Sequence, residues 1–68
     1  MPYVQIKMAH DPKAPLTIEQ KKALVKGATE LLVNVAGRNP TNILVEIIEG
    51  DPDNWGVGGQ LVSERRKA

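Results

Sequence analysis

The chain has 68 residues, of which 41% are hydrophobic, with no cysteine, one histidine and a formal net charge of +1. Its 9 basic residues nearly balance its 8 acidic ones, which argues against a nucleic-acid partner, and no apolar run approaches the ~18 residues of a membrane span. A chain this short forms one domain, residues 1–68, and has no disulfide to stabilise it. We therefore expect it to associate with other copies of itself.

The amino terminus bears on the location of the protein. Residues 1–5, MPYVQ, lack the basic and then apolar layout of a secretion signal. The absence of cysteine is consistent with a reducing compartment. We expect a cytoplasmic protein.

The first predicted element is a strand over residues 3–9, where apolar and polar side chains alternate, as they do in a strand with one buried face. Pro12 and Pro15 end this strand, because proline lacks the backbone N–H and has a fixed φ. Residues 10–16 are therefore a loop.

A helix is predicted to begin at Thr17, which with Gln20 fits the capping box that satisfies free backbone donors at a helix start. Apolar side chains then recur at spacings of three and four residues: Leu24, Ala28, Leu31, Leu32 and Val35. Gly37 favours a left-handed stop, and Asn39-Pro40 prevents the helix from continuing.

A second strand is predicted over residues 43–48, apolar on both faces except at Glu46, which favours a central position in a sheet. Strand, helix and strand form a β-α-β unit with parallel strands and a right-handed crossover. One helix can cover only one face of such a sheet. We expect the other face to meet another subunit.

The remaining residues predict a turn at 50–53 and a glycine-bent hairpin over 55–62. The basic run at 65–67 is expected to be a solvated tail. The predicted fold class is therefore α+β, with a β-α-β unit followed by a C-terminal β-hairpin.

Few residues can carry chemistry. Without cysteine, and with His10 as the only histidine, the chain offers no metal site or covalent nucleophile of a familiar kind. His10 is expected to be an ordinary loop residue. The glycines at 56–59 do not connect a strand to a helix, so they predict a turn rather than a phosphate-binding loop.

Pro2 is the main candidate for a catalytic residue. Methionine before a small residue such as proline is normally removed, and removal would expose a secondary amine at the start of the first strand. An apolar pocket favours the neutral form of such an amine, which can then act as a general base. Because Met-Pro openings are common, this pattern alone favours the simpler interpretation, an ordinary strand start.

Three segments together resemble the short tautomerases of the oxalocrotonate tautomerase family: MPYVQIK at 1–7, EQKK at 19–22 and NWGVGGQL at 54–61. The resemblance covers nearly the whole chain. It implies a tautomerase-like fold that assembles as a hexamer, built as a trimer of dimers, or as a dimer.

The resemblance also implies an isomerase that transfers a proton between the enol and keto forms of a small anionic 2-oxo acid without a cofactor. Pro2 matches the catalytic base of the family. Trp55 matches an aromatic residue of the pocket, often supplied by a neighbouring chain, although it can also serve as a plain interface anchor. The expected partners are the substrate and other copies of the chain.

Two positions depart from the family pattern. Where its best-studied members have arginine in the first loop and in the second strand, this chain offers Lys13 and Leu44, and lysine lacks the planar fork that grips a carboxylate at two points. Arg38 and Arg66 are alternative cations. Side chains alternate between the two faces of a strand, so Lys7 and Pro2 are expected on opposite faces, and Lys7 is not expected to contribute. The alternative function is therefore a non-catalytic subunit of a hetero-oligomer whose other chain supplies the arginines.

Overall fold

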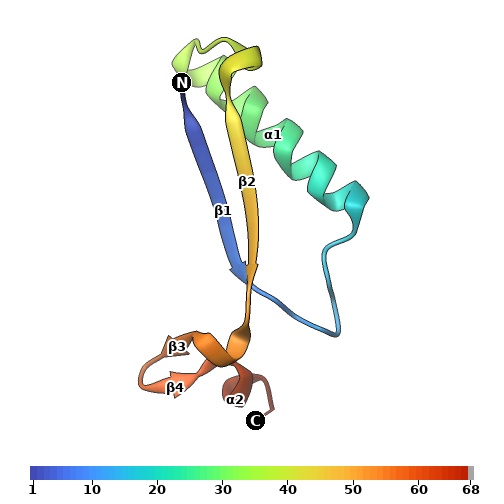
Figure 1. Ribbon diagram of the computed structural model, residues 1–68, viewed down its shortest axis with the longest axis vertical. Helices are drawn as coiled ribbons and strands as arrows, with labels where there is room; N and C mark the ends of the chain where they lie inside the picture. Colours follow the sequence, from blue (N-terminus) through green and yellow to red (C-terminus); the bar gives the residue numbers. More distant parts are fainter. Residues whose placement is uncertain (68) are drawn as a thin grey trace. The chain divides into compact units, whose positions relative to one another are not determined.

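The computed structural model describes residues 1–67 (Figure 1). Its elements, in chain order, are β1 (Tyr3–Ala9), α1 (Ile18–Ala36), the 3₁₀ turn η1 (Pro40–Asn42), β2 (Leu44–Gly50), the 3₁₀ turn η2 (Pro52–Asn54), β3 (Gly56–Val57), β4 (Gln60–Leu61) and α2 (Val62–Lys67). The strands β1 and β2 run parallel in a two-stranded sheet, and α1 is the connection between them. The predicted α+β class and β-α-β order are confirmed.

The two long strands are joined by backbone hydrogen bonds near each end. The Leu44 amide donates to the Pro2 carbonyl at 3.0 Å, and the His10 amide donates to the Gly50 carbonyl at 2.6 Å. Side-chain exposure alternates along β1 from Tyr3 to Met8, as the period of the sequence predicts.

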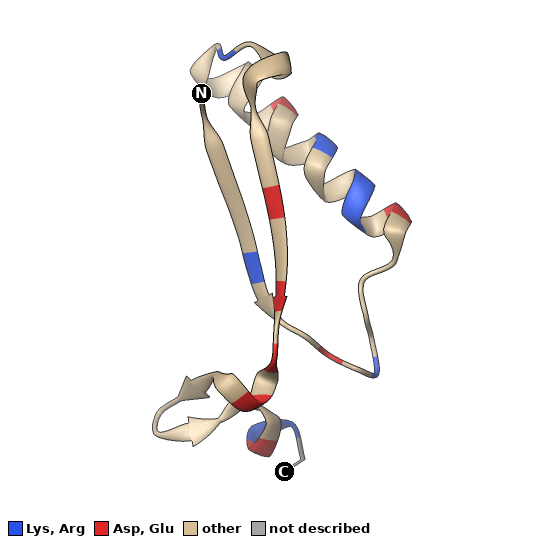
Figure 2. Ribbon diagram, in the orientation of Figure 1, with Lys and Arg blue, Asp and Glu red and all other residues tan. Residues whose placement is uncertain are grey.

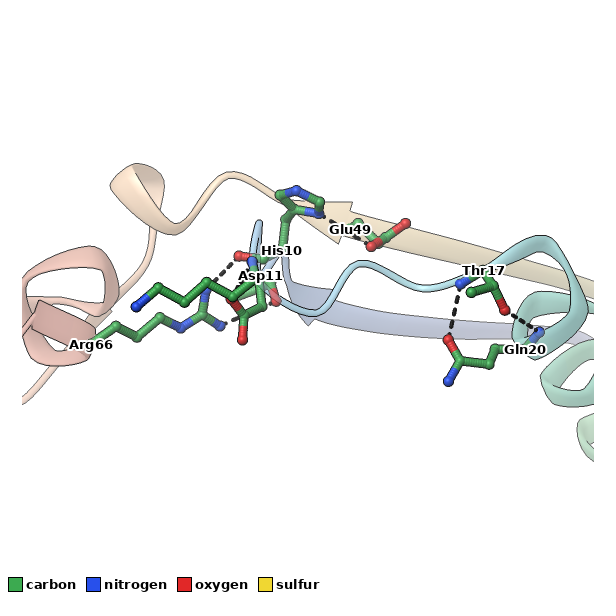
Figure 3. A network of polar contacts seen from close by, with 8 residues as sticks. His10, Asp11, Thr17, Gln20, Glu49 and Arg66 are labelled. Atoms are coloured by element: carbon green, nitrogen blue, oxygen red, sulfur yellow. Dashed lines mark hydrogen bonds and ion pairs between the residues drawn. The ribbon is translucent and has the colours of Figure 1, made fainter.

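Helix α1 begins and ends where its capping residues predict. The Gln20 amide donates to the Thr17 hydroxyl at 3.1 Å, and the Thr17 amide donates to the Gln20 side-chain oxygen at 2.9 Å, which completes the capping box (Figure 3). At the other end Gly37 has a φ of 63° and its amide donates to the Val33 carbonyl. Both local signals are confirmed.

The contacts of the chain fall into two compact units. The first, here the helix unit, contains residues 1–6 and 16–47, and the second, here the hairpin unit, contains residues 7–15 and the segment from Ile48 onward. In the helix unit α1 runs alongside the strands (Figure 1). Both the sheet and α1 carry acidic as well as basic side chains (Figure 2).

No hydrophobic side chain of the described part of the chain is fully buried. Tyr3 and Leu44 of the sheet are 56% and 51% exposed, and Leu31 and Val35 of α1 are 62% and 79% exposed. A single copy therefore lacks a closed core, which supports the expectation of association. Within residues 1–67 no helix is both long and apolar enough to cross a membrane.

The hairpin is confirmed, and a short helix follows it. Strands β3 and β4 pair antiparallel, with Gly58 and Gly59 at φ values of 61° and 82° between them, the positive angles that a tight hairpin turn of this type requires. The residues after β4 form α2, where the sequence predicts only a solvated tail. The Val62 amide donates to the Trp55 carbonyl at 2.8 Å, so the start of α2 is tied to the residue before the hairpin.

Candidate active site

Pro2 lies half-buried at the start of β1, and its carbonyl accepts the hydrogen bond from Leu44 described above. Its nitrogen is an amide while Met1 is attached, so it becomes an amine only when Met1 is removed. The Met1 residue is 85% exposed, so most of its surface lies in solvent. Removal of Met1 would therefore leave the Pro2 amine at the amino terminus, immediately before β1.

Leu44 is the β2 neighbour of Pro2 in the sheet. Its side chain is apolar and cannot bind a carboxylate. Tyr3 and Glu46 are likewise exposed, and the Tyr3 hydroxyl donates a short hydrogen bond to the Glu46 carboxylate. The side-chain amide of Gln5 also donates to this carboxylate, at 3.3 Å.

These hydrogen bonds change the acidity of both groups. The bond from the Tyr3 hydroxyl, which stabilises the ionised carboxylate, is the main cause that lowers the pKa of Glu46. The same bond raises the pKa of Tyr3, because the hydroxyl proton is held by a negative acceptor. The exposed sheet face near Leu44 therefore carries one ionised carboxylate and no cation among Tyr3, Gln5, Leu44 and Glu46.

Trp55 lies half-buried in the hairpin unit, directly after η2. Its indole packs so close to Gly50 that a side chain there would overlap Nε1 and lie 3.1 Å from Cε2. The Lys7 ammonium lies 5.8 Å from the centroid of the indole ring. A shallow hollow of about 340 Å³ is lined by Lys7, Asn54, Trp55 and Gly56.

Lys13 is exposed in the loop after β1, and its backbone amide donates to the Asp11 carboxylate at 3.0 Å. It lines a larger groove of about 600 Å³, also in the hairpin unit, with Asp11, Pro12, Pro52, Ser63 and Arg66. The groove therefore combines two cations with one carboxylate.

Arg66 reaches from α2 to the end of β1. Its guanidinium donates to the His10 carbonyl in a short hydrogen bond and to the Ala9 carbonyl at 3.3 Å (Figure 3). The side chain is exposed but is held by these bonds, so it is a positioned cation rather than a member of a freely solvated tail. Arg38, the other alternative, lies exposed just after α1.

Two features of the hairpin unit were missed by the sequence analysis. His10 Nδ1 lies 3.2 Å from Glu49 Oε2 (Figure 3). Because parallel strands end at the same edge of a sheet, the positions of these residues at the ends of β1 and β2 could have predicted the contact. The other feature is the contact between Lys7 and Trp55. The alternation of side chains along β1 does not predict this contact, because Trp55 lies outside that strand.

The structure places each predicted site residue beside another side chain of interest, and one of these, Lys7, was not a predicted site residue. Pro2 and Leu44 are neighbours in the helix unit, while Trp55 with Lys7, and Lys13 with Arg66, lie in the hairpin unit. Within residues 1–67 no cluster of three or more histidine, cysteine or carboxylate side chains could hold a metal ion.

Comparison with known proteins identifies the family of the chain. A model of the tautomerase enzyme family matches residues 2–65. The probable tautomerase K2 of Dickeya dadantii is 48% identical over 67 residues, which cover 98% of this chain and 96% of that protein. A 2-hydroxymuconate tautomerase of Comamonas testosteroni is 34% identical over 64 residues, covering 94% and 95% of the two chains.

Among solved structures, DmpI from Helicobacter pylori superimposes with a TM-score of 0.87 at 37% sequence identity, and each chain covers 98% of the other. This agreement extends over both units of the chain described above. The chain belongs to the tautomerase family and is a tautomerase-type isomerase.

Proposed function

We propose that the chain interconverts the enol and keto forms of a small anionic 2-oxo acid, and that Pro2, freed by removal of Met1, is the general base. The observation that carries this proposal is the position of Pro2, half-buried at the start of β1 behind a methionine that is 85% exposed. Membership of the tautomerase family supplies the type of reaction.

The reaction requires one group to move one proton. The neutral amine of Pro2 accepts the proton of the enol hydroxyl, and the electrons of that O–H bond form the carbonyl π bond. The π electrons of the enol C=C bond shift along the conjugated system to a carbon, where they form a new C–H bond with the proton returned by the ammonium. No electron pair leaves the substrate and no cofactor is required. An α-amino group titrates near ~7.7 to 8 in water, and an apolar surrounding favours its neutral form at physiological pH.

Three further residues are proposed to bind the substrate. Trp55, supplied by a neighbouring copy, forms an apolar wall, and its indole is already fixed against Gly50. Lys13 attracts the carboxylate as a point charge, and Leu44 contacts the carbon chain beside Pro2. The relative from Comamonas testosteroni, named for 2-hydroxymuconate, indicates a 2-hydroxydienoate as the first substrate to test.

We propose that the working form is a single-domain subunit of a cytoplasmic homo-oligomer, either a hexamer built as a trimer of dimers or a dimer. The support is the lack of any fully buried hydrophobic side chain in the described part of one copy, together with the exposed Tyr3 and Leu44. Leu44, where the family pattern has arginine, favours the alternative of a non-catalytic subunit in a hetero-oligomer. The purified chain separates these two, because only the first alternative is active alone.

The decisive experiment compares the processed chain with a chain that carries an uncleaved N-terminal extension. Absorbance follows the ketonisation of a 2-hydroxydienoate at equal protein concentrations, and intact mass verifies the state of Met1. The processed chain should be active and the extended chain nearly inactive, because its proline nitrogen is an amide without useful basicity. Equal rates would show that Pro2 is not the base.

A further inference from the structure

The hollow beside Trp55 has the features of an anion site. Its cation is Lys7, whose ammonium lies 5.8 Å from the indole centroid, within the range of a cation–π contact. Asn54 lines the same hollow, and an asparagine side chain has two amide hydrogens to donate. An anion there would meet a full positive charge, a polar donor and an apolar wall.

The wall is held in place from two sides. Gly50 leaves room for the indole edge that any larger residue would displace, and the Trp55 carbonyl accepts the hydrogen bond from the first residue of α2. Because the wall is fixed, the ammonium that lies over it is restricted as well. Such preorganisation lowers the entropic cost of binding.

Lys7 also has an unused charge. Among the described residues no carboxylate forms an ion pair with Lys7, whose ammonium instead lies over the face of Trp55. The groove of Lys13 differs, because Asp11 contributes a negative charge there and Arg66 already donates to two backbone carbonyls. Of the cations that line these two hollows, Lys7 is the one whose hollow contains no carboxylate among its lining residues.

We propose that Lys7 and Asn54 bind a carboxylate group of the substrate in the hollow beside Trp55. This inference rests on the proposed function, in which Trp55 walls the site. A Trp55 that is supplied to a neighbouring site brings Lys7 with it, since both belong to the hairpin unit. Lys7 can then reach the substrate even though Lys7 and Pro2 of one copy are expected on opposite faces of the strand.

Binding can be measured without turnover, because Trp55 is the only tryptophan of the chain and its fluorescence reports on the hollow. The processed full-length protein is titrated with fumarate, a small dicarboxylate that cannot enolise, at constant ionic strength set with sodium chloride. We expect saturable quenching. Lys7→Met should weaken fumarate binding about tenfold or more, the effect of losing a charged hydrogen-bond donor.

Two variants serve as controls. Lys7→Arg keeps the charge and the cation–π contact and should retain most of the affinity. Lys26→Met removes an equivalent exposed charge from α1 and should leave the titration unchanged. In turnover assays, Lys7→Met should raise KM more than it lowers kcat.

Equal fumarate affinity in the wild type and in Lys7→Met, or no saturable quenching in the wild type, would overturn the proposal, and Lys7 would then be only a packing partner of Trp55. The result also separates this proposal from the function of Pro2. If fumarate binding depends on Lys7 but the chain ketonises nothing, the carboxylate site stands and the proposed reaction is wrong.

Discussion

Trp55 can occupy its place only because residue 50 is a glycine: a methyl group on Gly50 would overlap the indole nitrogen and lie 3.1 Å from Cε2. Gly50→Ala should therefore displace the indole, red-shift its emission and lower kcat/KM. Gly27→Ala is the matched control, because a methyl group at Gly27 would meet no atom within 4 Å and alanine favours a helix. Unchanged emission and activity in Gly50→Ala would mean that the indole is not fixed by this contact.

Leu44 provides a test of assembly. Leu44→Asp places a charge on the exposed sheet face, and burying that charge in an interface without a partner is costly. Light scattering at micromolar concentration should show a smaller species than the wild type. Ala23→Asp, an equal change of charge on the exposed side of α1, should keep the wild-type size. A wild-type chain that is folded and monomeric would contradict the proposed oligomer.

The capping box of α1 makes a specific contribution to stability. Thr17→Ala removes the hydroxyl that accepts from the Gln20 amide and should lower the free energy of unfolding by about 1 kcal/mol. Thr29→Ala is the control, since its hydroxyl bonds only to the Val25 carbonyl of the same helix. Urea denaturation at one fixed protein concentration measures both. An equal loss in the two variants would argue against a role for the cap.

The Tyr3–Glu46 hydrogen bond predicts a dependence of stability on pH. Because the pKa of Glu46 is lowered in the folded chain, its contribution is present above the ordinary carboxyl pKa of ~4.3 and is lost as pH falls through the folded value. Because the pKa of Tyr3 is raised, the contribution of its protonated hydroxyl is present below ~10 and is lost as pH rises through the folded value.

Melting curves measured from pH 3 to 7 therefore test the contribution of Glu46 to stability. Glu46→Gln should reduce the loss of melting temperature on the acid side, while Glu30→Gln, on exposed α1 surface, should leave it as in the wild type. The effect should be small, since both partners of the bond are exposed. An equal loss of melting temperature at acid pH in Glu46→Gln and the wild type would contradict the assignment of this pH dependence to Glu46.

Pro2 carries the largest expected effect on rate. Pro2→Ala keeps an amino-terminal amine after processing but changes its basicity and rigidity, and we expect ketonisation to fall by about 10² or more, within the range for a general base. The oligomer should persist, because the Pro2 carbonyl that bonds Leu44 is still present in alanine. A rate within a fewfold of the wild type, measured on protein with verified mass, would count against the mechanism.

Local signals predicted most of the fold. The alternation over β1, the capping box at Thr17 and the left-handed Gly37 each depend on residues a few positions apart, and all three occur as expected. The hairpin followed from glycines that permit positive φ. Patterns of this kind are readable because the forces that they express act within one element.

The missed features depend on residues far apart in the chain. Arg66 holds the carbonyls of Ala9 and His10, and Lys7 lies over Trp55, contacts that no periodicity within one element encodes. The sequence analysis excluded Lys7 because Lys7 and Pro2 are expected on opposite faces of one strand. That argument did not consider Trp55, which comes much later in the chain and lies beside Lys7. The roles of Pro2, Lys13, Leu44 and Trp55 stay predictions until the variants are measured.

The lack of a closed core in one copy also affects how the protein reaches its native state. Since the described part of a single chain fully buries no hydrophobic side chain, the proposed contact between copies would supply much of the driving force for folding. Encounter between chains then enters the refolding rate, which should increase with protein concentration. Dilution would act as a denaturant, and the melting temperature of this tautomerase has meaning only together with the concentration at which it was measured.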